Sequence, residues 1–272
     1  MNGFSISGQL KTLVKLADGS LSVTNGSFKN VHDQAGLVHY NIYMCGDAKA
    51  EIKNVAITTT GIGIMMTENS KITELNATVD SMRVFNDDNC FDAISLIDNA
   101  RIDKISGGNY QARYTEDVTV LRTQSGFVMN YDYGCALRLN AANTYVGEIS
   151  GGTFLSVDDV GGMGAPIYVN NGTLNLISGG HFGFTELGVS YNTFNSIFEH
   201  TTNGGKINAI TGGTFVKGSY GNNRTGFKWD FAGLVDASGC KIVDTGKTSQ
   251  VFVQFSTKLN AYSLAIIEVV AK

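Results

Sequence analysis

Proline is almost missing from this chain, since Pro166 is the only one among 272 residues. Because proline cannot donate a backbone hydrogen bond, its scarcity is compatible with long, unbroken ladders of β-strands. The 33 glycines therefore do not indicate a disordered chain rich in both residues.

Charged residues are also scarce, at 16% of the chain with a net charge of −4. There is no cluster of lysine and arginine beside aromatic residues, so we expect no binding to nucleic acid. No stretch is apolar enough to span a membrane, and we expect no membrane insertion. The first five residues, Met1 to Ser5, have neither the basic nor the long apolar region of a secretory signal.

The cysteines are few and isolated. Cys45, Cys90, Cys135 and Cys240 form no CxxC motif and have no histidine at the spacing of a metal site. We therefore expect small, buried cysteine side chains, and neither a metal nor a cofactor. The histidines are scattered as well, and no Ser-His-Asp set can be assembled from the sequence.

The chain does contain a phrase that occurs four times, Ile-Ser/Thr-Gly-Gly-x-aromatic, with a further apolar residue three positions before each isoleucine. The copies are Ile105–Tyr110, Ile149–Phe154, Ile177–Phe182 and Ile210–Phe215. Weaker copies are Val23–Phe28, Leu75–Val79 and Ala237–Cys240. Such self-similarity marks stacked copies of one supersecondary unit.

An alternating apolar segment, typical of a half-buried strand, precedes the phrase in each unit. A corner rich in Asn, Asp and Gly separates the two, and these residues favour tight turns. The unit therefore reads as strand, corner, short strand, Gly-Gly bend and aromatic-led strand, which is one rung of a parallel β-helix. The alternating segments include Ile42/Met44, Ile64/Met66, Ile94/Leu96, Leu137/Leu139 and Ile167/Val169.

We predict an all-β, single-stranded parallel β-helix of about eight rungs over residues 20–245. Residues 1–19 are expected to cap one end, and residues 246–272 to form a C-terminal β cap or an oligomerisation element. The copies are unevenly spaced, so loops must absorb insertions, and a local function is expected in these loops. The predicted insertions are residues 80–92, 111–134, 155–164, 183–195 and 216–230.

The C-terminal segment is apolar at nearly every position, through Ile266, Ile267, Val269 and Val270. A lone edge strand of this composition would leave one face exposed. The segment either caps the rod or joins subunits, and the two interpretations carry equal weight.

Catalysis on such a rod would require carboxylates that converge from neighbouring rungs or loops. The best of a weak set are Asp132, Asp158 and Asp159, and none of them forms a diagnostic motif. The other insertion carboxylates, such as Asp87, Asp88 and Asp92, are expected to be solvated loop acids. The sequence leaves enzymatic activity open and favours a protein without it.

Aromatic residues in the insertions suggest carbohydrate binding, because rings stack on the apolar faces of sugars. The candidates are Trp229, Phe227, Tyr220, Tyr131 and Tyr133. The alternative is that these rings pack their loops against the rod. The repeated isoleucines and aromatics are instead expected to form core columns, and the corner asparagines hydrogen-bond ladders.

The Ile-Ser-Gly-Gly-x-Phe rungs resemble those of right-handed parallel β-helix proteins of bacteriophage particles, the tailspike and fibre-like proteins. They are also similar to rungs of β-helix adhesins and pectin-lyase-like enzymes. The resemblance covers most of the chain and is specific for the fold rather than for the function. It implies a right-handed rod, often a homotrimer, whose loops recognise bacterial surface polysaccharide.

For function, the resemblance favours a structural and host-binding protein of a virion that is assembled in the host cytoplasm beside other virion proteins. The apparent lack of a signal peptide agrees with this interpretation. One alternative is a polysaccharide depolymerase, either a hydrolase or a lyase, on the same fold. Another is an adhesin module at a bacterial cell surface or in the extracellular space.

Overall fold

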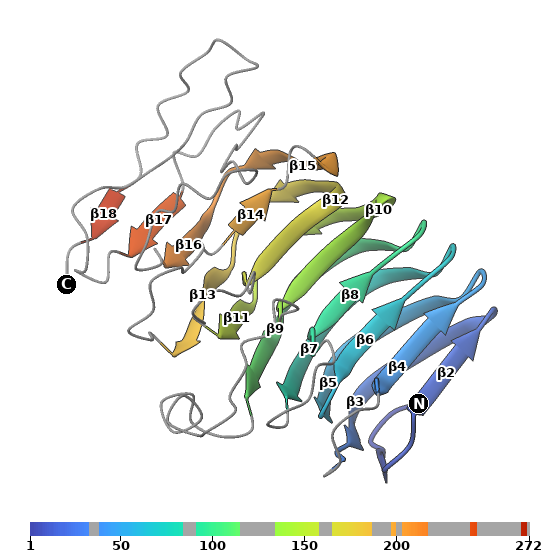
Figure 1. Ribbon diagram of the computed structural model, residues 1–272. Coiled ribbons are helices and arrows are strands. Elements are labelled where there is room, and N and C mark those ends of the chain that lie inside the picture. The colour runs from blue at the N-terminus through green and yellow to red at the C-terminus, as the bar shows by residue number, and fades with distance from the viewer. Residues whose placement is uncertain are drawn as a thin grey trace, which may run out of the picture.

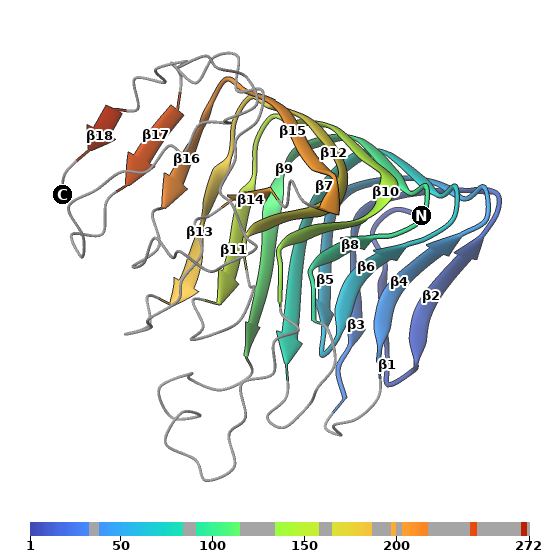
Figure 2. The same ribbon diagram turned by 45° about the horizontal axis from the view of Figure 1, so that its top comes forward.

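The computed structural model describes residues 1–32, 38–83, 91–114, 134–157, 165–186, 197–199, 203–216, 240–243 and 268–270. In this part of the chain every regular element is a β-strand. Stacked strands pair in parallel, and they coil around one elongated hydrophobic core (Figure 1, Figure 2). The predicted all-β parallel β-helix is confirmed.

Each rung contains three strand positions, and equivalent positions stack into columns that we call A, B and C. Column A contains the first strand of each rung. Its members are β2 (Thr12–Ala17), β4 (Tyr40–Cys45), β6 (Ile62–Met66), β8 (Ile94–Leu96), the first halves of β10 (Leu137–Ile149) and β12 (Ile167–Ile177), and β14 (Ile197–Glu199).

Columns B and C follow column A within each rung. In the first rungs one long strand forms column B, bends, and continues as column C: β3 (Ser20–Asn30), β5 (Lys49–Thr59), β7 (Lys71–Arg83) and β9 (Arg101–Tyr114). In later rungs column B contains the second halves of β10 and β12, and β15 (Gly205–Ile210). Column C starts with β1 (Ser5–Gly8) and continues after β9 with β11 (Thr153–Val157), β13 (His181–Glu186), β16 (Gly213–Val216), β17 (Cys240–Val243) and β18 (Glu268–Val270).

The isoleucines of the repeated phrase stack into one core column, as predicted. Ile149 pairs with Ile105 on one side and with Ile177 on the other, and Ile177 pairs with Ile210. None of the four is more than 3% exposed. Since burying one such side chain contributes about 1.5–3 kcal/mol, this column is a main source of stability.

The aromatic residues of the phrase form a second core column. The ring of Phe154 stacks between those of Tyr110 and Phe182, at centroid distances of 4.9 Å and 5.1 Å. The buried hydroxyl of Tyr110 donates a hydrogen bond of 2.8 Å to the carbonyl oxygen of Gly107. The tyrosine therefore fills the column without leaving its polar atom unpaired.

The apolar residues of column A point into the core, as the sequence pattern predicts, but the expected half-burial is wrong for the middle rungs, because the alternate residues Ser95, Arg138 and Tyr168 are also buried. Ile64 pairs with Ile94, and Met66 pairs with Leu96, and all four side chains are buried. The predicted starts of the insertions are too early, because the strands of column C continue into them: β7 ends at Arg83, β9 at Tyr114, β11 at Val157 and β13 at Glu186. Residues 80–83, 111–114, 155–157 and 183–186 are therefore strand, and the next described strand in each case belongs to column A.

The corner between columns A and B carries the predicted asparagine ladder. Asn143 donates to Asn99 at 2.9 Å, Asn99 to Asn69 at 3.0 Å, and Asn69 to Asp47 at 3.1 Å, each through Nδ2. A second ladder joins Asn203, Asn170 and Asn140. These side chains connect neighbouring rungs, so their repetition reflects structure.

Candidate functional site

The bend between columns B and C depends on residues with a left-handed backbone. In two early rungs φ is +53° at Asn25 and +53° at Asn54. In later rungs the second glycine of the phrase has this conformation, with φ from +99° to +119° at Gly108, Gly152, Gly180 and Gly213. Glycine adopts it readily and asparagine more easily than most residues, so these residue types determine where the chain bends.

The first glycine of the phrase allows the rungs to approach one another. A Cβ atom at Gly179 would lie 2.5 Å from the carbonyl oxygen of Ser150, and one at Gly212 would lie 2.3 Å from that of Ser178. Any side chain there would push the rungs apart. The second glycine turns the backbone and at Gly108 also allows close stacking, since a Cβ atom there would lie 2.2 Å from the carbonyl oxygen of Ala77.

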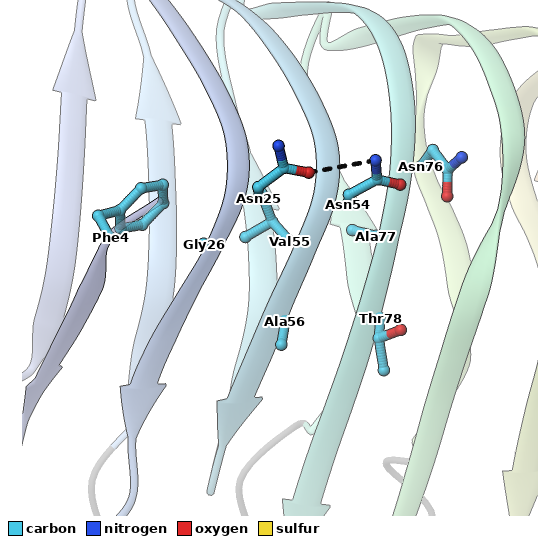
Figure 3. Close-up of a pocket in the computed structure, with 9 residues that line it drawn as sticks. All are labelled: Phe4, Asn25, Gly26, Asn54, Val55, Ala56, Asn76, Ala77 and Thr78. Atoms are coloured by element: carbon cyan, nitrogen blue, oxygen red, sulfur yellow. Dashed lines mark hydrogen bonds between the residues drawn. The ribbon is translucent and has the colours of Figure 1, made fainter. Parts of the chain in front are cut away.

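A shallow pocket of about 430 Å³ lies where the bends of three rungs stack, and we call it the bend pocket. The amides of Asn25 and Asn54 are both exposed, and Asn54 Nδ2 donates to Asn25 Oδ1 at 3.3 Å (Figure 3). Figure 3 places Phe4 at one end and Asn76 at the other. The lining residues are Phe4, Asn25, Gly26, Asn54, Val55, Ala56, Asn76, Ala77 and Thr78.

Phe4 occupies space that Gly26 provides. A Cβ atom at Gly26 would lie 2.2 Å from the Phe4 ring, so only glycine fits beside it. The Phe4 ring also contacts the buried ring of Phe28, at a centroid distance of 4.7 Å. Because Phe4 itself is only half-buried and lines the pocket, this packing holds a partly accessible ring at the end of the asparagine row.

Ion pairs follow the outer face of column B beside the bend pocket. Lys53, which precedes Asn54, has its Nζ 2.8 Å from Glu51 Oε1 and 2.7 Å from Glu74 Oε2. These hydrogen bonds, first that to Glu51, raise the pKa of Lys53 to about 12. Glu74 also accepts a 2.8 Å hydrogen bond from Ser106, and its pKa is lowered mainly by Lys53. The ammonium group is thus held between two carboxylates.

The same pattern recurs further along column B. Lys104 Nζ lies 3.1 Å from Glu148 Oε2, and Ser178 Oγ donates to Glu148 Oε1 at 2.5 Å. The hydroxyl of Ser178, followed by Lys104, lowers the pKa of Glu148. The outer face of column B therefore carries charges that are paired with one another.

A second polar hollow, of about 570 Å³, lies at the corner between columns A and B. Its carboxylates are used by the backbone: Glu68 accepts from the amide of Gly46 at 2.7 Å, and Asp98 accepts from that of Glu68 at 3.1 Å. Within the described residues no group of three or more His, Cys, Asp or Glu side chains is placed to hold a metal ion. This corner is explained by its role in joining rungs.

The expectation that Asp92 is a solvated loop acid is wrong. Its side chain is 1% exposed, and its carboxylate lies 2.9 Å from Arg138 Nε and 3.1 Å from Arg138 Nη2. It also accepts a 2.8 Å hydrogen bond from the amide of Cys135 and one from the hydroxyl of Ser95. The physical reason is register: Arg138 pairs with Ser95 in column A, which places the guanidinium beside Asp92.

Burial dominates the chemistry of this buried pair. It raises the pKa of Asp92, against the opposing effect of Arg138. It also raises the pKa of the Cys135 thiol to about 12. Cys135 and Cys45 are both buried, as predicted, and neither forms a disulfide. The ion pair joins Asp92 of one rung to Arg138 of the next rung, at the start of column A.

Of the sequence-predicted site residues, two lie in the described part of the chain. Val269 and Val270 lie in β18 and pair with Ile242 and Val243 of β17. The other candidates lie outside the described residues: Asp132, Asp158, Asp159, Tyr131, Tyr133, Tyr220, Phe227, Trp229, Ile266 and Ile267.

Sequence reasoning did not identify Phe4, Asn25 or Asn54 as site residues. One signal was present, because Asn25-Gly26 stands where later copies of the phrase have Gly-Gly. An asparagine there supplies the left-handed backbone and also adds an amide to the outer surface.

No protein-family model, curated protein or solved structure matches this chain. Within the described residues, no helix has the length and hydrophobicity needed to cross a membrane.

Proposed function

We propose that this chain is the rod of a bacteriophage tailspike or fibre-like protein, which binds bacterial surface polysaccharide. The bend pocket carries the proposal: it is an open hollow lined by amides from successive rungs and by an aromatic ring at its end. Sugars suit such a surface, because their hydroxyls exchange hydrogen bonds with amides and their apolar faces pack on rings.

The periodicity of the rod supports a polymeric ligand. Successive rungs are spaced by about 4.8 Å, the separation of hydrogen-bonded strands. One sugar of an extended polysaccharide has a similar length, so a glycan lying along the rod would present equivalent hydroxyls to equivalent side chains. Asn25, Asn54 and Asn76 follow one another in that direction (Figure 3).

We also propose that the rod assembles as a homotrimer within the virion, in contact with other virion proteins, through the apolar residues Ile266, Ile267, Val269 and Val270. Apolar surface left exposed at the edge of a rod favours association. Light scattering is expected to give about three times the 29.1 kDa mass of one chain. A stable monomer would contradict the proposed trimer. It would not bear on glycan binding, which is tested separately.

Replacing both asparagines by glycine tests the proposed site. The Asn25→Gly/Asn54→Gly variant keeps a backbone that tolerates positive φ but removes both amides. Each lost hydrogen bond costs about 0.5–1.5 kcal/mol, so the loss of two is expected to lower the affinity for a bound glycan about fivefold to a hundredfold. Asn143→Ser, in the ladder at the other corner, is the matched control and is expected to bind as the parent does.

The assay is binding to an array of bacterial surface polysaccharides, followed by titration of the best ligand. Equal affinity of the parent and the double variant would refute the bend pocket as the site. A parent protein that binds none of the polysaccharides would refute the recognition function. Release of reducing or unsaturated ends from a bound polymer would identify a depolymerase instead.

A further inference from the structure

We propose that the bend pocket selects uncharged glycans over acidic ones, through the ion-pair ladder on its column B side. This inference rests on the proposed function and names the ligand class of the same site. It makes Glu51 and Glu74 determinants of specificity, because both form ion pairs with Lys53, the lysine that precedes Asn54.

The pocket lining is uncharged. Its nine residues comprise three asparagines, one threonine and five apolar or glycine residues, without an ionisable side chain. A carboxylate of an acidic sugar would therefore lose water on entering and would find amides but no cation in compensation. A neutral sugar loses only hydroxyl hydration, which the amides of Asn25 and Asn54 replace.

The nearest cation on the column B wall is already paired. Lys53 lies one residue before Asn54 and contacts carboxylate oxygens of Glu51 and Glu74 at 2.8 Å and 2.7 Å. Lys104 acts on Glu74 as well and pairs with Glu148, so the ladder of three carboxylates and two ammonium groups carries one negative charge and repels an approaching anion at low ionic strength. Ser106 holds Glu74 in place through a 2.8 Å hydrogen bond.

Column C does not supply a substitute cation within the lining. Lys29 is exposed in β3, three residues beyond Gly26, and does not line the pocket. Arg113 binds Asp80 with both Nε and Nη2, at 2.8 Å and 2.7 Å. Recruitment of an acidic glycan by Lys53 would therefore require this lysine to leave its carboxylates.

The test compares neutral and acidic polysaccharides of matched length, with dextran and galactan against polygalacturonate and hyaluronate as probes beside the best ligand of the array. The parent protein is expected to bind neutral polymers at least tenfold more tightly than acidic ones. Glu51→Gln/Glu74→Gln releases Lys53 and is expected to raise affinity for acidic polymers about tenfold at low salt, with neutral binding unchanged. Adding Lys53→Met should abolish that gain.

Asp103→Asn is the matched control, because it releases Lys71 from its ion pair at the start of β7, where no lining residue of the bend pocket lies. It is expected to leave both affinities unchanged. If the parent binds acidic polymers as tightly as neutral ones, and loses both in Asn25→Gly/Asn54→Gly, the inference fails while the proposed function stands. If the parent binds no polymer, the proposed function fails and the inference with it.

Discussion

The buried ion pair between Asp92 and Arg138 leads to a prediction about which partner can be removed safely. In Asp92→Asn the guanidinium keeps its charge but loses its counter-ion, although it is only 8% exposed. Breaking a buried pair in this way costs about 3–5 kcal/mol. The parent loses stability as the pH rises through the raised pKa of Asp92, whereas the variant has no carboxyl there to titrate, so the cost should be larger at about pH 4.5 than at about pH 7.5.

Removing the other partner should have a cost with the opposite pH dependence. In Arg138→Met the carboxyl of Asp92 stays buried, and burial already raises its pKa above the unfolded value. A carboxyl with a raised pKa in the folded state contributes stability below the unfolded pKa, near 4, and loses it as the pH rises through the folded pKa. Arg138→Met should therefore lose about 3 kcal/mol near pH 7.5 and clearly less near pH 4.5.

Urea unfolding at the two pH values measures these free energies. The double variant Asp92→Asn/Arg138→Met removes both charges and should recover most of the loss, since neutral replacements of buried pairs are well tolerated. Lys71→Met breaks the exposed Lys71–Asp103 pair, with 2.6 Å between the charged atoms, and should cost less than about 1 kcal/mol. Equal, pH-independent losses in the two single variants would refute the reasoning.

Three further predictions concern the core and the bends. Phe154→Ala removes a ring stacked at 4.9 Å and 5.1 Å between two others, and urea unfolding should record a loss of about 3–5 kcal/mol; a loss below about 1 kcal/mol would contradict the column. Gly108→Ala combines φ of +99° with a Cβ 2.2 Å from the Ala77 carbonyl oxygen, so it should lower the thermal midpoint more than Gly19→Ala, which has φ of +72° and open space. The Cys135 thiol, with its pKa raised to about 12 by burial, should resist alkylation near pH 8 until the protein unfolds, as peptide mass mapping would detect; rapid labelling of the folded protein would contradict its burial.

The fold could be predicted because each rung repeats its own local requirements. The inward isoleucines alternate with outer residues, and the second glycine of each phrase is needed for a positive φ, so both signals are visible within one unit. The alignment of the repeated phrases also predicted the register between rungs. Gly213 pairs with Cys240, the residue that replaces the second glycine in the last weak copy. Likewise His181 pairs with Thr153 and Thr214, as its position in the phrase predicts.

The candidate site was harder to predict, because its properties depend on neighbouring rungs. Lys53 contacts Glu74 only because β5 stacks on β7. The sequence does not indicate that Glu51 and Glu74 bind the same lysine. Asp92 shows the same effect over a longer separation, since its partner Arg138 lies 46 residues away. Asp92 is the last residue of the predicted insertion 80–92 and lies two residues before β8, so the sequence could not decide whether its side chain is solvated or buried.

The sequence by itself determined the all-β class, the rung unit, the inward columns and the bend positions, because apolar alternation and the backbone freedom of glycine act within a few residues. Only the tertiary structure decided which side chains meet across rungs. It placed Phe4 in the space left by Gly26, aligned Asn25 with Asn54, and buried Asp92 against Arg138. These contacts join residues that are 22 to 46 positions apart, and the number of residues inserted between rungs sets that separation without altering the stacking.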